Sequence, residues 1–281
     1  MVKGEIIMSY ANFKETIWSK HIQHEKEKLL TFKPDCDYIF EGEAKQGKQV
    51  KILGVGRPTI KKYVPGTEID GIETPADNSL FLDIDQYDYF NYGVDNIDKA
   101  QSKEGLMEAL AEETTRGLAE AEDKYLAKVA ALGAAEGGIS DSTAITTGTN
   151  AKKAIDNAFE YLWDKGVTTK DKVTIYLTPW FYILFQDKLV ELKTQNDGLL
   201  AKGVLGLYNS ANVKMSNQLH NDGTDDHIII KTSKAIACCN GIDKLEAYSP
   251  EKSFMDAIKG LNTYGAKVIR PKELYVIKAH K

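Results

Sequence analysis

The stretch Tyr89-Phe-Asn-Tyr-Gly-Val-Asp-Asn-Ile-Asp-Lys-Ala-Gln101 separates two hydrophobic patterns in the middle of the chain. Before and within it, apolar residues alternate with polar ones, which predicts a strand with one buried face. These residues are Leu80, Leu82, Ile84, Phe90, Tyr92 and Val94. After it, apolar residues recur at spacings of three, four or eight, which predicts one amphipathic helix over residues 95–132. These residues are Leu106, Leu110, Leu118, Ala121, Tyr125, Val129 and Leu132.

The predicted helix is long, and its surroundings are acidic. Asp95 or Asp98 can cap its start, and Gly133 can end it. At ~1.5 Å per residue it spans ~50 Å, about three times the usual helix length. Residues 81–130 hold twelve acidic and five basic residues, whereas residues 244–281 hold eight basic and four acidic. We expect complementary charges where copies of the chain pack side by side.

Two segments before the helix have no core of their own. Residues 12–32 are amphipathic at helical spacing, which predicts an arm that docks on another surface. Residues 36–92 alternate with period two and are interrupted by Gly and Pro, notably at 54–58, which predicts a long β-ribbon. Its lysines at 45, 48, 51, 61 and 62 suit a solvated or partner-facing hairpin. We expect removal of about 42–62 to leave a folded subunit.

The C-terminal half alternates helices and strands. The Gly/Ser/Thr-rich residues 133–150 predict a linker or boundary. Helices are predicted at 151–165, ended by Gly166, and at about 179–193, with Thr178 as N-cap. Strands are predicted at 173–177, 211–215, 227–231, 266–269 and 274–277, with a turn at 221–223 and either structure at 253–260. The predicted class is α+β.

Composition excludes several classes of protein. The chain has 281 residues, 42% hydrophobic and 27% charged, which fits one large or two modest globular domains. The longest apolar run, residues 180–185, is far shorter than the ~20 residues of a membrane span, and the N-terminus lacks a signal peptide's apolar region. Three cysteines form no even disulfide framework, which favours a reducing compartment. A net charge of −5 disfavours a protein built mainly to bind nucleic acid.

The most tempting chemical motif is Gly42-Glu-Ala-Lys-Gln-Gly47-Lys48-Gln49, one letter from a phosphate-binding loop. That loop needs Ser or Thr after the Lys to bind Mg²⁺, and a helix whose N-terminus faces the phosphates. Here Gln49 stands at the metal position, and the residues that follow predict a strand. A plain hairpin turn is therefore favoured over a nucleotide-dependent enzyme.

Other candidate ligands are weaker still. His21 and His24 are three residues apart and fit a solvated arm better than a metal site, because no third ligand lies nearby. The side chains of adjacent Cys238 and Cys239 would diverge on a strand, so burial is favoured over metal or redox use. No Ser–His–Asp arrangement is evident. We therefore expect no catalytic, cofactor-binding or metal-binding residues, and no enzyme activity.

The order of these parts resembles the major capsid proteins of tailed bacteriophages, whose shell fold (the Johnson fold) is shared with the encapsulins. Three local stretches carry the resemblance. Residues 89–101 look like the strand that leads into the family's spine helix, and Leu177-Thr-Pro-Trp-Phe181 is similar to the strand-to-helix step of its axial lobe. Residues 253–279, with Gly260-Leu-Asn-Thr-Tyr-Gly-Ala-Lys-Val-Ile-Arg-Pro-Lys-Glu-Leu274, look like its closing segment.

The resemblance implies a domain division and a set of partners. Residues 1–35 would be an N-terminal arm, 36–80 an extended loop, 81–135 with 228–265 the peripheral domain, and 136–227 with 266–281 the axial domain. It implies self-assembly through hexamers and pentamers into an icosahedral virion shell around double-stranded DNA, in a host bacterial cytoplasm. It also implies a portal protein and, in some members, decoration proteins, but no membrane.

Two departures from the family limit the comparison. Because the arm begins near Met1, we expect a separately encoded scaffolding protein. Some members crosslink a loop lysine to an asparagine, but no motif identifies a partner for the ribbon lysines, so crosslinking stays unassigned. The alternative within the same fold is an encapsulin-like compartment shell that holds a cargo enzyme.

Overall fold

The computed structural model describes residues 26, 29–39, 49–55, 60, 62–63, 65–66, 68, 77–95, 106–191, 206–240, 244–251 and 255–281. Its helices are α4 (Leu106–Gly133), α5 (Gly148–Asp164) and α6 (Pro179–Glu191), with short 3-10 turns η1 (Lys33–Asp35), η2 (Ala134–Glu136) and η3 (Pro271–Glu273). Its strands are β1 (Gln49–Val55), β2 (Asp77–Asp83), β3 (Gln86–Asp95), β4 (Gly138–Ile139), β5 (Thr143–Ala144), β6 (Val173–Leu177), β7 (Leu207–Tyr208), β8 (Ala211–Met215), β9 (Asp226–Thr232), β10 (Ile236–Asn240), β11 (Lys244–Tyr248), β12 (Met255–Val268) and β13 (Leu274–His280).

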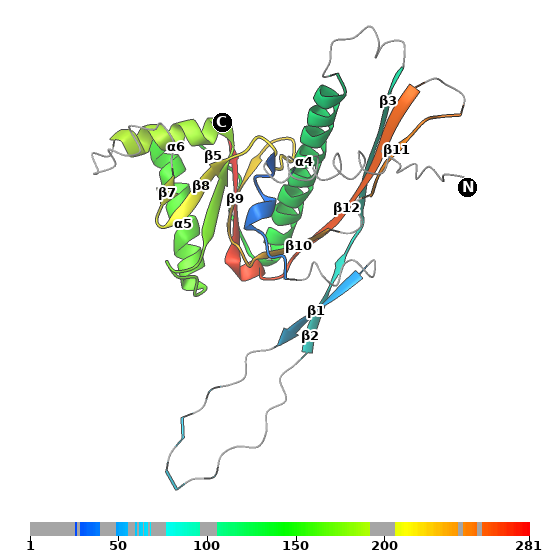
Figure 1. Cartoon of the computed structure of the whole chain (residues 1–281). Helices are drawn as coiled ribbons and strands as arrows, with labels where there is room; N and C mark the ends of the chain where they lie inside the picture. The colour runs from blue at the N-terminus through cyan, green and yellow to red at the C-terminus, as the bar shows by residue number, and fades with distance from the viewer. Residues whose placement is uncertain are drawn as a thin grey trace.

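One half of the molecule, which we call the lobe, is a seven-stranded mixed sheet with α5 and α6 against it (Figure 1). The strand order is β4-β13-β9-β6-β8-β7, and β5 continues the edge beside β13. β9 is antiparallel to both β6 and β13, while β8 runs parallel to β6. The sequence-predicted strands at 173–177 and 211–215 are confirmed residue for residue.

Both faces of this sheet are covered. Ile228 and Ile230 of β9 face the core under α5 and α6, which includes Phe159, Phe181 and Phe185. The intervening Ile229 faces the other core, where α4 packs through residues such as Leu126. Side chains that alternate between two apolar cores explain why β6 is buried at all five positions.

The other half, which we call the long sheet, is built around the 14-residue strand β12. Along one edge of β12, β3 pairs antiparallel with residues 255–264. Along the other edge, β11 pairs with residues 257–261 and β10 with residues 264–268, both antiparallel. α4 lies along one face of this sheet, as Figure 1 shows. Burial in that contact raises the pKa of the Tyr92 hydroxyl of β3.

The ribbon, by which we mean β1, β2 and the described residues from 60 to 68 between them, has its two strands against the end of the long sheet. The two strands are antiparallel over their full length, from the pair Gln49–Asp83 to the pair Val55–Asp77. Val50, Ile52 and Leu82 pack with Ala237 and Cys239 in a small third core. Gly265 permits this approach, because a Cβ there would lie 2.1 Å from the carbonyl oxygen of Asp83. The predicted β-ribbon is thus confirmed for β1 and β2, whereas residues 60, 62 and 63, where the alternation also predicted β-structure, are not in a strand.

Several predicted boundaries are wrong. Asp95 is the last residue of β3 rather than a helix cap, and Asp98 lies outside the described residues. The predicted start of α6, by contrast, is confirmed: Pro179 is its first residue and Thr178 is at the N-cap position, where its carbonyl accepts from Tyr182 N. The Thr178 hydroxyl makes no capping hydrogen bond among the described atoms. Gly54 does not interrupt the ribbon, because β1 continues through Val55.

Three other segments differ from prediction because of long-range pairing. Residues 133–150 are not a linker but supply β4, β5 and the first turn of α5. Residues 253–260 and 266–269 are not separate elements, because β12 runs unbroken through Met255–Val268. The strands at 211–215 and 226–232 are not neighbours, because β6 lies between them. Within the described residues, no helix combines the length and apolarity that crossing a bilayer requires.

Candidate functional site: interaction surfaces

The N-terminal segment, by which we mean Lys26 and residues 29–39, lies between α4 and the seven-stranded sheet. Pro34 lies in the first turn of η1. Proline is favourable there because the backbone N–H that it lacks would have no partner within the helix. Asp37 then forms a parallel bridge to Ala237: its N–H donates to Ile236 O (2.9 Å), and its carbonyl accepts from Cys238 N (3.0 Å). The end of the predicted arm is therefore part of the folded body.

On the α4 side, charged groups hold this segment in a buried position. Glu122 Oε1 lies 2.5 Å from Lys33 Nζ and Oε2 lies 3.1 Å from Lys26 Nζ, and all three side chains are buried. The Lys26 ammonium also donates to Asn262 Oδ1 of β12 (2.9 Å). Glu122 Oε2 is paired with Lys26 by charge but accepts no hydrogen bond among the described atoms. Asp123 accepts from the backbone N–H groups of Thr31 (2.8 Å) and Phe32 (3.1 Å), and burial raises its pKa.

On the lobe side, Asp35 is the anchor. Its carboxylate accepts from Lys214 Nζ (2.6 Å) and the Tyr176 hydroxyl (2.7 Å), and it pairs with Lys172 Nζ at 3.0 Å. Burial alone would raise the Asp35 pKa, but these three donors together lower it to about 2. The Phe32 ring stacks on Tyr176 with centroids 4.0 Å apart. The segment thus joins α4 to the lobe by charge-assisted hydrogen bonds.

These contacts correct the expectation of an acidic helix surface available to neighbours. Glu122 and Asp123 are used within the chain itself. The exposed charged residues on the described face of α4 are mixed in sign: Glu112, Glu113, Arg116, Lys124 and Lys128. Sequence counting missed this because it does not distinguish a buried carboxylate from a solvated one.

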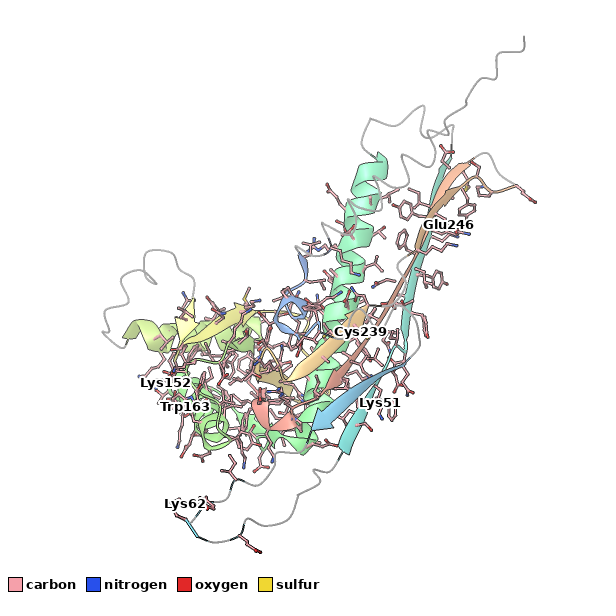
Figure 2. All side chains as sticks on the ribbon, turned by 60° about the horizontal axis from the view of Figure 1, so that its bottom comes forward. Lys51, Lys62, Lys152, Trp163, Cys239 and Glu246 are labelled. Atoms are coloured by element: carbon pink, nitrogen blue, oxygen red, sulfur yellow. The ribbon has the colours of Figure 1, made fainter. Side chains whose placement is uncertain are left out.

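The open face of the long sheet, which lies away from α4, is the first uncovered surface. It carries Tyr87, Tyr89 and Leu261, with Tyr89 79% exposed. Glu246 on the same face pairs with Lys244 and with Lys259 (3.0 Å), and the Lys244 contact is the main cause that lowers the Glu246 pKa, to about 2. Figure 2 places Glu246 on the upper part of this sheet. The face is aromatic with balanced charge, the composition of a protein interface.

The ribbon and the lobe provide two further uncovered surfaces. Between β1 and β2, Ile60 is 84% and Tyr63 63% exposed. Lys51 and Lys62 are exposed there too, whereas the predicted ribbon lysines 45, 48 and 61 lie outside the described residues (Figure 2). On the described part of the lobe, five large apolar side chains are exposed by more than two fifths: Ile139, Trp163, Ile183, Leu207 and Met215. Large apolar side chains are thus exposed on the long sheet, on the ribbon and on the lobe, and such exposure favours contacts with other molecules.

The sequence-derived chemical candidates have these outcomes. The loop Gly42–Lys48 lies outside the described residues, but Gln49–Val55 after it is a strand, so the helix that a phosphate-binding loop requires does not follow. His21 and His24 also lie outside. Cys238 and Cys239 diverge as predicted, the former into the core beside α4 and the latter into the core under the ribbon. In the described part of the chain, no three potential ligands converge on a metal position.

One cluster that sequence reasoning missed joins Ser142, Asp225 and His280. Ser142 Oγ donates to Asp225 Oδ1 (2.8 Å), and His280 Nδ1 lies 2.7 Å from the same oxygen. The Ser142 hydrogen bond is the main cause that lowers the Asp225 pKa. In a catalytic triad the imidazole lies between hydroxyl and carboxylate and uses both ring nitrogens. Here one nitrogen faces both groups, so the cluster ties β13 to its neighbouring loops rather than activating Ser142.

Solved structures match this fold along most of the chain. A structure from Mycobacterium phage Che8 matches with a TM-score of 0.73 at 24% identity, over 88% of this chain and 90% of that one. The capsid structure of cyanophage P-SCSP1u matches with a TM-score of 0.70 at 17% identity, over 84% and 85%. A virus-like particle from Pyrococcus furiosus matches with a TM-score of 0.58 at 11% identity, over 94% and 99%.

No family model and no curated protein sequence matches the chain. The structural matches confirm the expected α+β fold with its long spine helix, the fold of phage capsid proteins.

Proposed function

We propose that this chain is the major capsid protein of a tailed bacteriophage and has a structural rather than a catalytic role. The observation that carries the proposal is the match to a phage capsid structure over 84% of this chain and 85% of that one. The exposed apolar residues of the ribbon, the long sheet and the lobe support it, because a subunit that functions alone does not benefit from exposing them.

In the proposed shell, subunits form hexamers and pentamers that close into an icosahedron around double-stranded DNA. Ring contacts of this kind are heterologous, since the surface that one copy offers differs from the surface that it meets. The ribbon suits such a contact because its Ile60 and Tyr63 are exposed, and Figure 2 shows Lys62, between them in the sequence, away from the sheets and helices. The lobe then meets its copies around the ring axis through its helices α5 and α6, which expose Trp163 and Ile183.

The proposed domain division follows from this assembly. We place residues 1–35 in the arm, 36–80 in the extended loop, 81–135 with 228–265 in the peripheral domain, and 136–227 with 266–281 in the axial domain. Two stretches correct these boundaries: residues 228–232 of β9 pair with β6 and β13 in the lobe, and residues 266–268 continue β12 in the long sheet. The partners are further copies of the chain, a scaffolding protein, a portal protein and packaged DNA held without sequence specificity. Assembly takes place in the host cytoplasm, and the product is the virion capsid.

Expression of the chain alone and with a candidate scaffolding protein tests the proposal, with negative-stain electron microscopy as the readout. We expect closed shells or capsomer-sized rings in at least one condition. Uniform monomers or dimers in both conditions would contradict the proposal. The paired variant Ile60→Asp/Tyr63→Ser should lose the shells, while Lys62→Ser, which changes a neighbouring exposed residue, should keep them.

An encapsulin-like compartment shell is the second candidate, and the match to the virus-like particle over 94% of the chain favours it. The two candidates differ in their contents. A particle purified from its natural source that contains DNA supports the capsid, whereas one that contains a cargo protein bound through a terminal tail supports the compartment.

A further inference from the structure

The strand β3 has one paired edge and one free edge. Along β12 its ladder keeps a single antiparallel register, from the pair Gln86–Tyr264 to the pair Asp95–Met255. Within the described residues, no other strand pairs with β3, and its backbone makes no hydrogen bond to backbone groups outside that ladder. Every second residue of β3 therefore directs its N–H and C=O groups away from the sheet. Such an edge is a template on which another strand can add.

This edge lacks the features that usually keep strands of different molecules apart. Edge strands of natural proteins are commonly protected by lysine, by proline, by a bulge or by being very short. β3 has ten residues, contains no lysine, arginine or proline, and has no bulge in its register. The edge strands of the lobe sheet, in contrast, have only two residues each: β4, β5 and β7. The edge of the long sheet is thus open to pairing, whereas the lobe edges are protected.

The side chains of β3 also lack neighbours. Tyr87 and Tyr89 are 52% and 79% exposed, and Phe90 and Tyr92, whose rings stack with centroids 5.8 Å apart, are only half-buried. No residue from 86 to 93 is buried. Aromatic residues favour strands because they pack against cross-strand and same-face neighbours. A strand with four aromatic side chains and no buried residue therefore has room for a further strand beside it.

We propose that β3 pairs antiparallel with β3 of a second copy of the chain, about a two-fold axis at Asn91. Residues that are opposite each other in a sheet lie on the same face, so such an axis passes through a residue rather than between two residues. With the axis at Asn91, Phe90 of each copy is opposite Tyr92 of the other, and Tyr89 is opposite Gly93. Aromatic pairs across strands are stabilising, and an aromatic ring opposite an edge glycine covers the exposed backbone.

Charge and symmetry favour β3 itself as the added strand. In this register Asp88 is opposite no acidic residue, so the pairing opposes no like charges. An axis at Phe90 would instead place Asp88 opposite Tyr92 and separate the aromatic pairs. The contact is isologous: each copy satisfies the free edge of the other, and neither copy keeps an edge on which a third β3 could add.

This pairing would join two four-stranded long sheets into one continuous sheet with both β3 strands at its centre. The inference deepens the proposed self-assembly and rests on it for the presence of further copies. Ring contacts alone do not close a shell, because the rings must also be joined to one another. A two-fold contact through β3 supplies such a joint.

Asn91→Cys tests the axis directly, because a residue on a two-fold axis is opposite its own copy. The Cα atoms of opposite residues in an antiparallel pair are ~4.5–5.5 Å apart, within the range that a disulfide spans. After mild oxidation of assembled full-length chain, we expect disulfide-linked dimers on non-reducing gels. The control Leu261→Cys changes an exposed residue of the neighbouring strand β12 and should stay at the wild-type level, since the three native cysteines are buried. Equal dimer yields from the two variants would overturn the proposal.

Charge variants at the same position provide a second test. Asn91→Lys and Asn91→Glu each place two like charges opposite each other, so each variant alone should lower the yield of assembled material in sedimentation by ~5-fold. An equal mixture of the two variants should restore the yield, because Lys then meets Glu. Asn91 Oδ1 accepts from the Tyr248 hydroxyl (3.1 Å), and the control Tyr248→Phe, which loses that bond alone, should assemble normally. A mixture that assembles no better than either variant would contradict the pairing.

Failure of this inference differs from failure of the proposed function. Normal shells from Asn91→Lys would remove the β3 pair and leave the capsid proposal standing. A wild-type chain that forms no shells, together with Asn91→Cys dimers in solution, would contradict the capsid proposal and support the β3 pair.

Discussion

The lobe and the long sheet are built from the same kinds of strand, yet one covers both of its faces and the other does not. In the lobe, α5 and α6 cover one face and α4 covers the other, so β6 is buried at every position. In the long sheet, α4 covers one face, and the opposite face leaves Tyr89 and Leu261 exposed. Both faces of the lobe sheet are thus covered by its own chain, and the lobe exposes apolar side chains only on its outside, whereas one whole face of the long sheet is left open.

The difference separates stability from assembly. Changes in the lobe core should alter the free energy of unfolding of the subunit. Changes on the open faces should alter assembly and leave the folded subunit nearly as stable as before. The N-terminal segment lies between these cases, because it connects both halves through buried charges.

The largest expected effect is on assembly. Replacement of residues 56–76 by an Asn-Gly turn is geometrically feasible, because Val55 and Asp77 are opposite each other in the ladder. We expect a folded subunit that forms no closed shells in electron micrographs. This design is safer than removal of 42–62, which would also delete the buried core residues Val50 and Ile52. Shells at wild-type yield would show that the ribbon is not an assembly element.

The largest stability effect is expected in the lobe. Phe181→Ala removes a fully buried ring from α6 and should lower the free energy of unfolding by ~4 kcal/mol in urea denaturation of disassembled subunits. The control is Ile183→Ala, two residues along the same helix and 57% exposed, which should cost less than ~0.5 kcal/mol. Equal losses in the two variants would contradict a self-contained lobe.

A slightly smaller loss is expected at the N-terminal segment. Glu122→Ala leaves the buried ammonium groups of Lys26 and Lys33 without their carboxylate and should cost ~3 kcal/mol. Glu112→Ala changes an exposed carboxylate on the same helix and should cost less than ~0.5 kcal/mol. If the two variants unfold at the same urea concentration, the buried ion pairs do not hold the segment.

Acid should weaken the contact of this segment with the lobe. The Asp35 pKa is about 2 in the folded chain and 3.8 ordinarily, so the unfolded chain binds the proton more readily. The stabilisation is complete above pH ~4 and is lost as the pH falls towards 2, by ~1–2 kcal/mol after allowance for solvent screening. Asp35→Asn should flatten this part of the stability–pH curve. A curve that keeps its wild-type slope between pH 4 and 2 would assign the dependence to other carboxyl groups.

The smallest effect on the subunit is expected on the open face. Tyr89→Ser removes a ring that is 79% exposed, so the melting temperature of the isolated subunit should change by less than ~2 °C. Assembly yield, measured by sedimentation of shells, should nevertheless fall. A large loss of subunit stability together with normal shells would reverse the assignment of this face.

Elements with local signals were predictable from the sequence. The β-branched run at 173–177 gave β6, and Gly166, with φ of 92°, ends the α5 region as predicted. The unbroken strand β12 was not predictable from the sequence, because Gly260 and Gly265 interrupt its hydrophobic pattern. Pairing with other strands along both of its edges keeps it extended.

The buried charges were not predictable either. Glu122 and Asp123 follow the spacing of a solvated helix face, and their partners Lys33 and Thr31 are about 90 residues away in the sequence. Lys231 is 196 residues from Asp35, and in a strand of isoleucines it carries no local sign of its contacts. Only tertiary packing decides whether such a group faces water or a partner.

The central claim is that the lobe is complete within one chain while the ribbon and the open sheet face are completed by other copies. A cryo-electron microscopy map of particles assembled from this chain tests it most directly. We expect an icosahedral shell in which Ile60 and Tyr63 are buried against a neighbouring subunit. Closed shells in which both side chains stay exposed to solvent, or a failure to assemble under any condition that keeps the subunit folded, would contradict it.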